Sequence, residues 1–469
     1  MTKLHFRLDH GDPDYYGGNM KNMLDRIMII NLSRLKLLFM VLAAFPCSTV
    51  VAAPVKLTVN PGYGSLVKSE KSTIPVKVSL EGISSVEKHI RPKVNVSIVI
   101  DRSGSMAGDK IEQARSAAIS AVNMLSSDDI VSIVTYDDSA QVLVPATKLT
   151  SKDWVIEKIR SISLGGNTAL FAGVSLAAAE IAKFRDPNLV NRIVLISDGL
   201  ANVGPSTPVQ LAELGKSLGK DGVAVSTIGL GLGYNEDLMS QLAEKSDGNH
   251  VFAERATDLS EVFRREFGDI LSVVAQNVSV TIGCRPGVRP LRVIGREAHT
   301  YDNKIVAKLN QIYSAQEKYI LFEVEVDPSK LNANNEITSV ELTYWDPVEK
   351  KEISDSSLKK IQLTELKSDM EKTIERPTFA AYYTQISALA SEEAIELADK
   401  GRKEEAIGLL KRSAEQSRQA ADSLDIPALK ADSDKRLMQG SAILSEPYER
   451  ARKKLKFENY TDRNQASGY

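Results

Sequence analysis

Residues 93–267 alternate short apolar runs with longer amphipathic stretches, and this alternation restricts the possible folds more than any other feature of the chain. Amphipathic helical stretches lie between the runs, at 110–125, 151–162, 169–184, 209–218 and 236–245. The segment QVLVPA (141–146), after the second run, predicts a short antiparallel edge strand. Near-continuous apolar strands separated by helices predict a doubly wound, mostly parallel sheet that is covered on both faces. The apolar runs are VNVSIVI (94–100), DIVSIVTY (129–136), RIVLIS (192–197), VAVSTIGL (223–230) and HVFAE (250–254).

β-like runs lie on both sides of this α/β region. Two precede it, within residues 55–80, and five follow it, within residues 277–345, with turn signals between them. The early strands cannot bury a core alone, so we expect them to complete an antiparallel β-sandwich formed by the later ones. The α/β domain is then an insertion in that sandwich. The expected segments are 1–53 (leader and export signal), 54–92 (sandwich strands), 93–267 (α/β domain), 268–365 (β-sandwich) and 366–469 (helical hairpin and tail).

The C-terminal segment, residues 366–469, is polar and has helical spacing of Ala and Leu. A break at Lys400-Gly401 divides its clearest part into two amphipathic stretches. These features predict a helical hairpin followed by a tail.

The N-terminal segment has the pattern of a Sec-type signal peptide. Arg34 and Lys36 precede the apolar run LLFMVLAAF (37–45), which is too short for a membrane span, and small residues follow near Ala52 and Ala53. We expect cleavage near these alanines, no transmembrane span in the mature chain, and a periplasmic or secreted, cell-surface location. The signal lies deep in the sequence, which predicts that translation starts at Met20, Met23 or Met28.

The overall charge gives no reason to expect binding to nucleic acid. The 469 residues include 59 basic and 61 acidic side chains, for a net charge of -2. Of the two cysteines, Cys47 lies in the export signal, so Cys284 alone cannot form an intramolecular disulfide in the mature chain. The cores of the domains must therefore provide the stability.

Five oxygen-bearing side chains fall at the ends of expected strands or at the start of a helix. They come from three segments: DRSGS directly after the first strand, GGNT before a helix, and SDG after a later strand. Ligands of open α/β sheets bind beyond the carboxyl ends of the strands, so these segments should meet at one edge. Hard cations such as Mg²⁺ prefer oxygen ligands, and Mn²⁺ or Ca²⁺ would also be accepted. The predicted metal site consists of Asp101, Ser103, Ser105, Thr168 and Asp198.

Other roles for these residues are less consistent with the sequence. Asp101 and Thr168 taken singly are ordinary helix caps, but that role does not account for Asp198 as well. A haloacid dehalogenase-type phosphohydrolase needs a second aspartate where the chain has Ser103. The glycines of 229–233 do not have the spacing of a dinucleotide-binding loop, and no Gly-Lys-Ser/Thr phosphate loop is present near Gly165. Nothing singles out His250 as a base for a serine nucleophile.

The Asp-x-Ser-x-Ser, Gly-Gly-Asn-Thr and Asp-Gly segments together resemble a von Willebrand factor A domain. The stretch GLGYNEDLM (231–239), followed by Gly248-Asn249, is similar to the bacterial secreted branch of that family. The resemblance implies a metal-ion-dependent adhesion site. It implies that Ser103 and Ser105 bind the ion directly, that Asp101 and Asp198 act through waters, and that Thr168 binds directly in the tight-binding state.

The sequence thus predicts an exported, non-enzymatic interaction protein that binds an acidic side chain of a protein partner through Mg²⁺. The alternative is a structural or assembly subunit of a cell-envelope complex, in which the helical tail makes the main contacts. Neither the partner nor the oligomeric state follows from the sequence.

Overall fold

A computed structural model describes residues 53–83 and 91–466. The export signal, Cys47 and the alternative start sites expected within residues 1–52 lie outside the described residues. Among the described helices, none combines the length and the apolar character needed to cross a bilayer.

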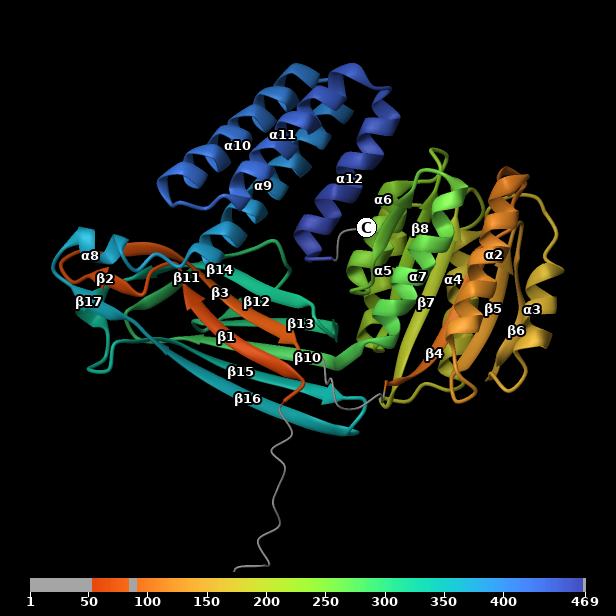
Figure 1. Cartoon of the computed structure of the whole chain (residues 1–469), viewed down its shortest axis with the longest axis horizontal. Coiled ribbons are helices and arrows are strands. Elements are labelled where there is room, and N and C mark those ends of the chain that lie inside the picture. The colour runs from red at the N-terminus through yellow and green to blue at the C-terminus, as the bar shows by residue number, and fades with distance from the viewer. Residues whose placement is uncertain (1–52, 84–90, 467–469) are drawn as a thin grey trace, which may run out of the picture. The chain divides into compact units, whose positions relative to one another are not determined.

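The central α/β domain is built on a six-stranded sheet with the order β6-β5-β4-β7-β8-β9 (Figure 1). All neighbours are parallel except β6, which pairs antiparallel with β5 at one edge. The mostly parallel sheet and its antiparallel edge strand confirm the sequence prediction. The strands are β4 (Lys93–Asp101), β5 (Ile130–Tyr136), β6 (Ala140–Lys148), β7 (Leu189–Ser197), β8 (Val223–Leu230) and β9 (His250–Ala253).

Helices cover both faces of this sheet, as near-continuous apolar strands require. One core contains side chains of α2, α3 and α7, and a second core on the other face contains side chains of α4, α5 and α6. Two short 3-10 turns, Gly104–Met106 and Ala256–Asp258, precede α2 and α7. The helices are α2 (Asp109–Met124), α3 (Lys152–Arg160), α4 (Leu170–Ala182), α5 (Pro208–Lys220), α6 (Glu236–Lys245) and α7 (Leu259–Leu271).

Most of the flanking strands form two packed antiparallel sheets that share one apolar core, and β2 and β17 pair in parallel as a separate two-stranded sheet. One sheet has the order β1-β3-β14-β11, and the other has the order β12-β13-β10-β15-β16. Strand β3 pairs with β14 along its length, from Ser72 opposite Val326 to Glu81 opposite Glu317. The early strands therefore join the later ones, and the α/β domain lies between β3 and β10 in the chain. The strands are β1 (Val55–Pro61), β2 (Ser65–Val67), β3 (Ser72–Gly82), β10 (Val273–Cys284), β11 (Val288–Ile294), β12 (His299–Tyr301), β13 (Lys304–Tyr313), β14 (Glu317–Val326), β15 (Glu336–Asp346), β16 (Lys351–Lys360) and β17 (Gln362–Thr364), with a 3-10 turn at Pro328–Lys330.

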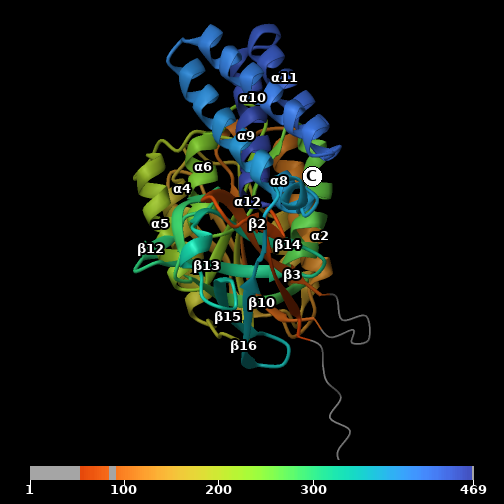
Figure 2. The same cartoon turned by 90° about the vertical axis from the view of Figure 1, so that its left-hand side faces the viewer.

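The C-terminal region contains more helix than the expected hairpin and tail. After the short helix α8, four long helices follow, of which α9, α10 and α11 pack against one another and α12 packs against α9 and α11 (Figure 2). The apolar spacing fades in α11 because much of its buried face is polar, including Asp432, Arg436 and Gln439. The helices are α8 (Lys367–Glu371), α9 (Arg376–Asp399), α10 (Lys403–Ser423), α11 (Ala428–Ser445) and α12 (Tyr448–Asn464).

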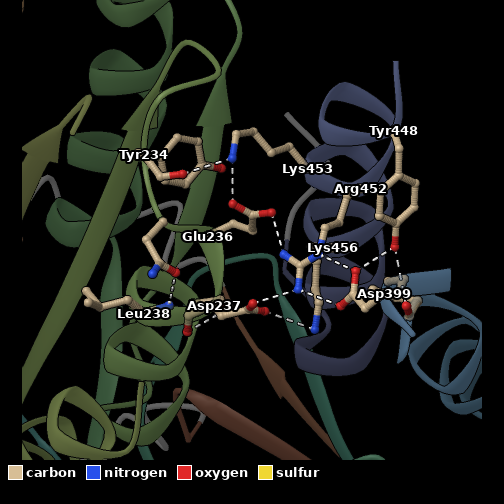
Figure 3. Close-up of polar contacts among 12 residues, drawn as sticks. Tyr234, Glu236, Asp237, Leu238, Asp399, Tyr448, Arg452, Lys453 and Lys456 are labelled. Carbon is tan, nitrogen blue, oxygen red and sulfur yellow. Dashed lines mark hydrogen bonds and ion pairs between the residues drawn. The ribbon is translucent and has the colours of Figure 1, made fainter. Parts of the chain in front are cut away.

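The last helix, α12, contacts the α/β domain through a network of charged side chains at the start of α6 (Figure 3). Helix α6 begins where Asn235 accepts a hydrogen bond from the backbone N–H of Leu238 at 3.0 Å. Glu236 and Asp237 follow in its first turn, where the helix dipole favours negative charge. Lys453 and Arg452 of α12 pair with these carboxylates. The helical region is therefore anchored to the loop that connects β8 to α6.

Candidate metal centre

The loop after β4 and the loop after β7 lie side by side at the carboxyl edge of the sheet. Strands β4 and β7 are adjacent and parallel, with Ile100 opposite Ile196, so Asp101 and Asp198 emerge close together. The third segment, before α4, is tied to the first by two backbone hydrogen bonds: Gly165 N–H to Arg102 carbonyl at 2.7 Å and Gly104 N–H to Gly166 carbonyl at 2.9 Å. All three predicted segments therefore meet at one edge.

Asp101 is fully buried and held by hydrogen bonds to both of its carboxylate oxygens. Oδ1 accepts the backbone N–H of Ser103 at 2.8 Å, and Oδ2 accepts the hydroxyls of Ser197 at 2.7 Å and Tyr136 at 3.2 Å. Burial raises the pKa of Asp101 and outweighs the lowering effect of the hydrogen bonds from Ser103 and Ser197. The pKa of Tyr136 is raised far more, by burial and by the neighbouring Asp101 carboxylate, so this phenol remains a hydrogen-bond donor.

The two serines connect the first segment to Asp198. The hydroxyl oxygens of Ser103 and Ser105 lie 3.1 Å apart, and Ser105 Oγ donates to Asp198 Oδ1 at 2.7 Å. Asp198 and Ser103 are buried, whereas Ser105 is exposed at the surface of the edge. The serine hydroxyls therefore lie next to one another between solvent and the buried carboxylates.

Thr168 faces the same space across Gly199. A Cβ atom placed on Gly199 would lie 3.2 Å from Thr168 Oγ1 and 3.3 Å from Ser105 Oγ, so a glycine here leaves room between the two hydroxyls. The backbone of Thr168 is fixed by Asn202, whose side-chain oxygen accepts its N–H at 2.8 Å. The structure thus brings all five predicted side chains together at one edge.

Neither of the two candidate cap residues caps the helix that follows it. The residue at the N-cap of α2 is Gly108 and that of α4 is Ala169, and neither Asp101 nor Thr168 makes a cap hydrogen bond to these helices. The oxygens of Asp101 are directed instead at Ser103, Ser197 and Tyr136. The helix-cap interpretation of the sequence is therefore wrong for both residues.

The residues brought together fit a hard divalent cation by their chemistry. All five side chains offer oxygen, two as carboxylates and three as neutral hydroxyls, which is the ligand type that Mg²⁺, Mn²⁺ and Ca²⁺ accept. Across residues 53–83 and 91–466, no three His, Cys, Asp or Glu side chains come together as a metal-binding group. A cation held at this edge would thus be held by few anionic groups.

Sequence reasoning missed the residues that support the five. Lys110, near the start of α2, forms an ion pair with Asp198 Oδ2 and donates to the Ser105 carbonyl at 3.3 Å. Tyr136, Ser197 and Asn202 fix Asp101 and Thr168, as described above. Ser197 directly precedes Asp198, and Asn202 follows it by four residues in the same loop, so their positions were a signal in the sequence. Nothing in the spacing of Lys110 or Tyr136 revealed their contacts.

His250 takes no part in this edge. It begins β9, its Nδ1 lies 2.9 Å from the Thr227 hydroxyl of the neighbouring strand, and its ring packs on Tyr234 and Tyr460. Burial, together with the nearby Lys453 ammonium, lowers the pKa of His250 to about 3. The imidazole is therefore neutral and enclosed, as a packing residue rather than a base for Ser103 or Ser105.

Comparison with known proteins agrees with the geometry of the central domain. Residues 95–265 match the model of the von Willebrand factor type A domain. The chain therefore contains a von Willebrand factor type A domain, and the predicted resemblance to this domain is confirmed.

This chain matches only part of the length of each of two relatives. Over 209 residues the chain is 31% identical to the uncharacterized protein YfbK of Escherichia coli (strain K12), covering 44% of this chain and 36% of YfbK. Over 267 residues it is 25% identical to the uncharacterized protein sll0103 of Synechocystis sp., covering 55% of this chain and 63% of that protein. The chain thus spans less than two thirds of either relative.

Among solved structures, the likeness reaches beyond the A-type domain. A von Willebrand factor type A protein from Catenulispora acidiphila aligns with a TM-score of 0.64 at 16% identity, covering 81% of this chain and 91% of its own. The ArnB paralog VWA2 from Sulfolobus acidocaldarius aligns with a TM-score of 0.61 at 17% identity, covering 89% of this chain and all of its own. At these identities the comparison concerns the fold, which is shared over most of the chain.

Proposed function

We propose that this chain is an exported, non-enzymatic interaction protein whose A-type domain binds a carboxylate of a protein partner through Mg²⁺. The observation that carries the proposal is the convergence of five oxygen-bearing side chains from three loops at the exposed edge of the sheet. Mn²⁺ and Ca²⁺ are alternative ions for the same ligands. When bound, the ion would supply an electrophilic position that a carboxylate can occupy.

The hydrogen bonds suggest different roles for the hydroxyls and the carboxylates. Asp101 has both oxygens engaged by buried donors, and Asp198 has one oxygen on Ser105 and the other on Lys110. Carboxylates held in this way would orient the ligands and contact the ion through waters. Ser103, Ser105 and Thr168 then provide the direct ligands, as the family resemblance implies. Neutral direct ligands leave the charge of the cation largely uncompensated, which favours an anionic group from the partner.

The proposal is tested by measuring metal binding in two variants, one at a buried and one at an exposed side chain, which differ in how strongly they could disturb the fold. Asp101→Asn keeps the shape of a buried side chain but removes its charge, and Ser105→Ala removes an exposed hydroxyl without disturbing the core. We expect each to weaken Mg²⁺ binding measured by calorimetry, by roughly tenfold to a hundredfold for the supporting carboxylate. Asp128→Asn is the matched control, because Asp128 is an exposed carboxylate that precedes β5 at the opposite end of the strands.

The result that rejects the metal site is unchanged Mg²⁺ affinity in both variants while circular dichroism shows a folded chain. For the partner, the purified wild-type protein is used as bait on an envelope extract with Mg²⁺ or with EDTA. We expect capture that is lost with EDTA and in Ser105→Ala. If the partner is captured equally well with EDTA and by Ser105→Ala, the carboxylate mechanism is contradicted even if the protein binds metal.

A second candidate function is favoured by one observation on the helical region. Helix α11 exposes three large apolar side chains, Leu437, Met438 and Leu444, and Met438 is 72% exposed. Here the helical region makes the main contacts of an assembly subunit. Deleting residues 366–469 is a poor test, because it also removes the contacts of α12 with α6. Met438→Ser/Leu444→Ser is the sharper variant: capture lost in this variant but resistant to EDTA favours the assembly role.

A further inference from the structure

Asp198 has no free carboxylate oxygen. Its Oδ1 accepts the Ser105 hydroxyl at 2.7 Å, and its Oδ2 is paired with the Lys110 ammonium. The Asp198 side chain is completely buried, whereas that of Lys110 is 35% exposed. The positive charge therefore lies between a buried candidate ligand and the solvent at the edge of the sheet.

The position of the Lys110 ammonium is fixed from several sides. Lys110 is the second residue of α2, and its Nζ also donates to the Ser105 carbonyl at 3.3 Å. A Cβ atom built on Gly231 would lie 3.9 Å from Lys110 Cε, so the loop after β8 borders the lysine stem. The lysine is thus held among the loops that form the candidate centre, rather than lying loose on the surface.

Lys110 changes the charge that a cation would meet. Asp101 and Asp198 together carry two negative charges and the three hydroxyls carry none, so one ammonium in contact reduces the net charge of the cluster to about -1. The guanidinium of Arg102, in the same loop, does not have this effect, because it is paired with Asp137 at 2.5 Å. Charges in partly buried surroundings are weakly screened by salt, so this difference remains at physiological ionic strength.

We propose that Lys110 sets the metal affinity of the site: it stabilises the Asp198 carboxylate in the metal-free protein and weakens cation binding, so that metal binding is reversible. The proposal rests on the proposed metal-binding function. An unpaired buried carboxylate is costly, so the metal-free protein gains from the pair. The same ammonium repels an incoming divalent cation and makes Asp198 a weaker electrostatic attractor for it.

The experiment compares Mg²⁺ affinity, by calorimetry, in the wild type and in Lys110→Gln, Lys110→Arg and Lys152→Gln. Lys110→Gln should bind Mg²⁺ about tenfold more tightly, which corresponds to ~1.4 kcal/mol. Lys110→Arg keeps the charge and should stay within about twofold of the wild type. Lys152→Gln is the matched control, because Lys152 also starts a helix and donates to a backbone carbonyl, that of Asn123 at 2.8 Å, and it should leave the affinity unchanged.

A second measurement covers the case in which Lys110→Gln is too unstable for calorimetry. The variant should then have a lower Tm than the wild type without metal, and Mg²⁺ should raise its Tm by more than it raises that of the wild type. Mg²⁺ affinity that is equal to or below that of the wild type, or an equal or smaller rise of Tm, overturns the proposal. Loss of Mg²⁺ binding in Asp101→Asn together with unchanged binding in Lys110→Gln rejects the role of Lys110 alone. Absence of Mg²⁺ binding in the wild type rejects the metal function itself.

Discussion

Removing the charge of Glu236 should loosen α12 from the A-type domain. Lys453 is 4% exposed, and its ammonium contacts Glu236 Oε2 at 2.5 Å and the Tyr234 carbonyl at 2.8 Å (Figure 3). In Glu236→Gln, the buried ammonium keeps the Tyr234 carbonyl and the Tyr234 ring, whose centroid is 4.8 Å away, but a neutral amide replaces its anionic partner. Breaking a buried ion pair by removing one partner costs about 3–5 kcal/mol, because the other charge is left uncompensated.

The reciprocal change, Lys453→Met, should cost less. Glu236 is also paired with Arg452, so its carboxylate keeps a cation when Lys453 is replaced. The loss is then closer to that of one hydrogen bond to a charged group, about 1.5–3 kcal/mol. The double variant Glu236→Gln/Lys453→Met removes both charges, and it should be less destabilised than the sum of the single variants.

Hydrogen exchange measured by mass spectrometry over residues 448–464 reports the local opening of α12 directly. A cost of 3 kcal/mol or more corresponds to exchange that is roughly a hundredfold faster or more. Glu157→Gln is the control, because Glu157 forms an exposed pair with Arg160 within one helix, and such pairs contribute about 0.5 kcal/mol or less. The prediction would be refuted if exchange in Glu236→Gln were as slow as in this control. It would also be refuted if the destabilisation of the double variant equalled the sum of the destabilisations of the two single variants.

Two further predictions concern the stability of the A-type domain. The native state keeps His250 neutral with a pKa of about 3, whereas the unfolded chain takes up a proton below pH ~6.5, so stability should fall by about 1.4 kcal/mol per pH unit below that value. His250→Asn should reduce this slope between pH 6 and 4.5 in urea unfolding, and an unchanged slope would exclude His250 as its source. A Cβ atom on Gly248 would lie 2.1 Å from the Val225 carbonyl oxygen, a backbone atom of β8 that cannot move freely. Gly248→Ala should therefore lower stability by about 1–3 kcal/mol or more in the same assay, and a wild-type midpoint would contradict the close approach.

The sequence predicted the parts of the fold whose burial is apolar. The parallel strands β4, β5, β7 and β8 are buried on both faces, so each appears as a near-continuous apolar run, whereas the edge strand β6 is only partly buried. Helix α6 has the predicted bounds Glu236–Lys245. Strand β16, Lys351–Lys360, was missed because it is an exposed edge strand paired with β15 alone, and its sequence KEISDSSLKK has little apolar pattern. An edge strand held mainly by backbone hydrogen bonds to one neighbour leaves little pattern in its own side chains, so it cannot be predicted from local sequence.

The candidate site was predictable to a similar extent and for a related reason. Asp101 and Asp198 each end or follow a buried strand, and parallel neighbours bring such positions together whatever the rest of the chain does. The contacts of Lys110 and Tyr136 depend on side chains that meet only after α2 and β5 have packed on the sheet. The order of the strands thus predicted which side chains meet, whereas the charge balance of the site depends on contacts between elements that the sequence does not reveal.

The pairing of β3 with β14 has a consequence for the order in which this chain folds. Ser72 pairs with Val326, so the A-type domain lies entirely within the loop that this contact closes. Residues 93–271 can complete their own sheet and both helical layers from contiguous sequence. Strand β3 pairs early with β1 on one side, but its other edge has no partner until residues 317–326 are made. Long-range pairings of this kind form slowly, and an unpaired strand edge is open to association with other chains. During synthesis, the edge that needs protection is therefore the free side of β3, which is made before the A-type domain and is covered only when β14 follows that domain.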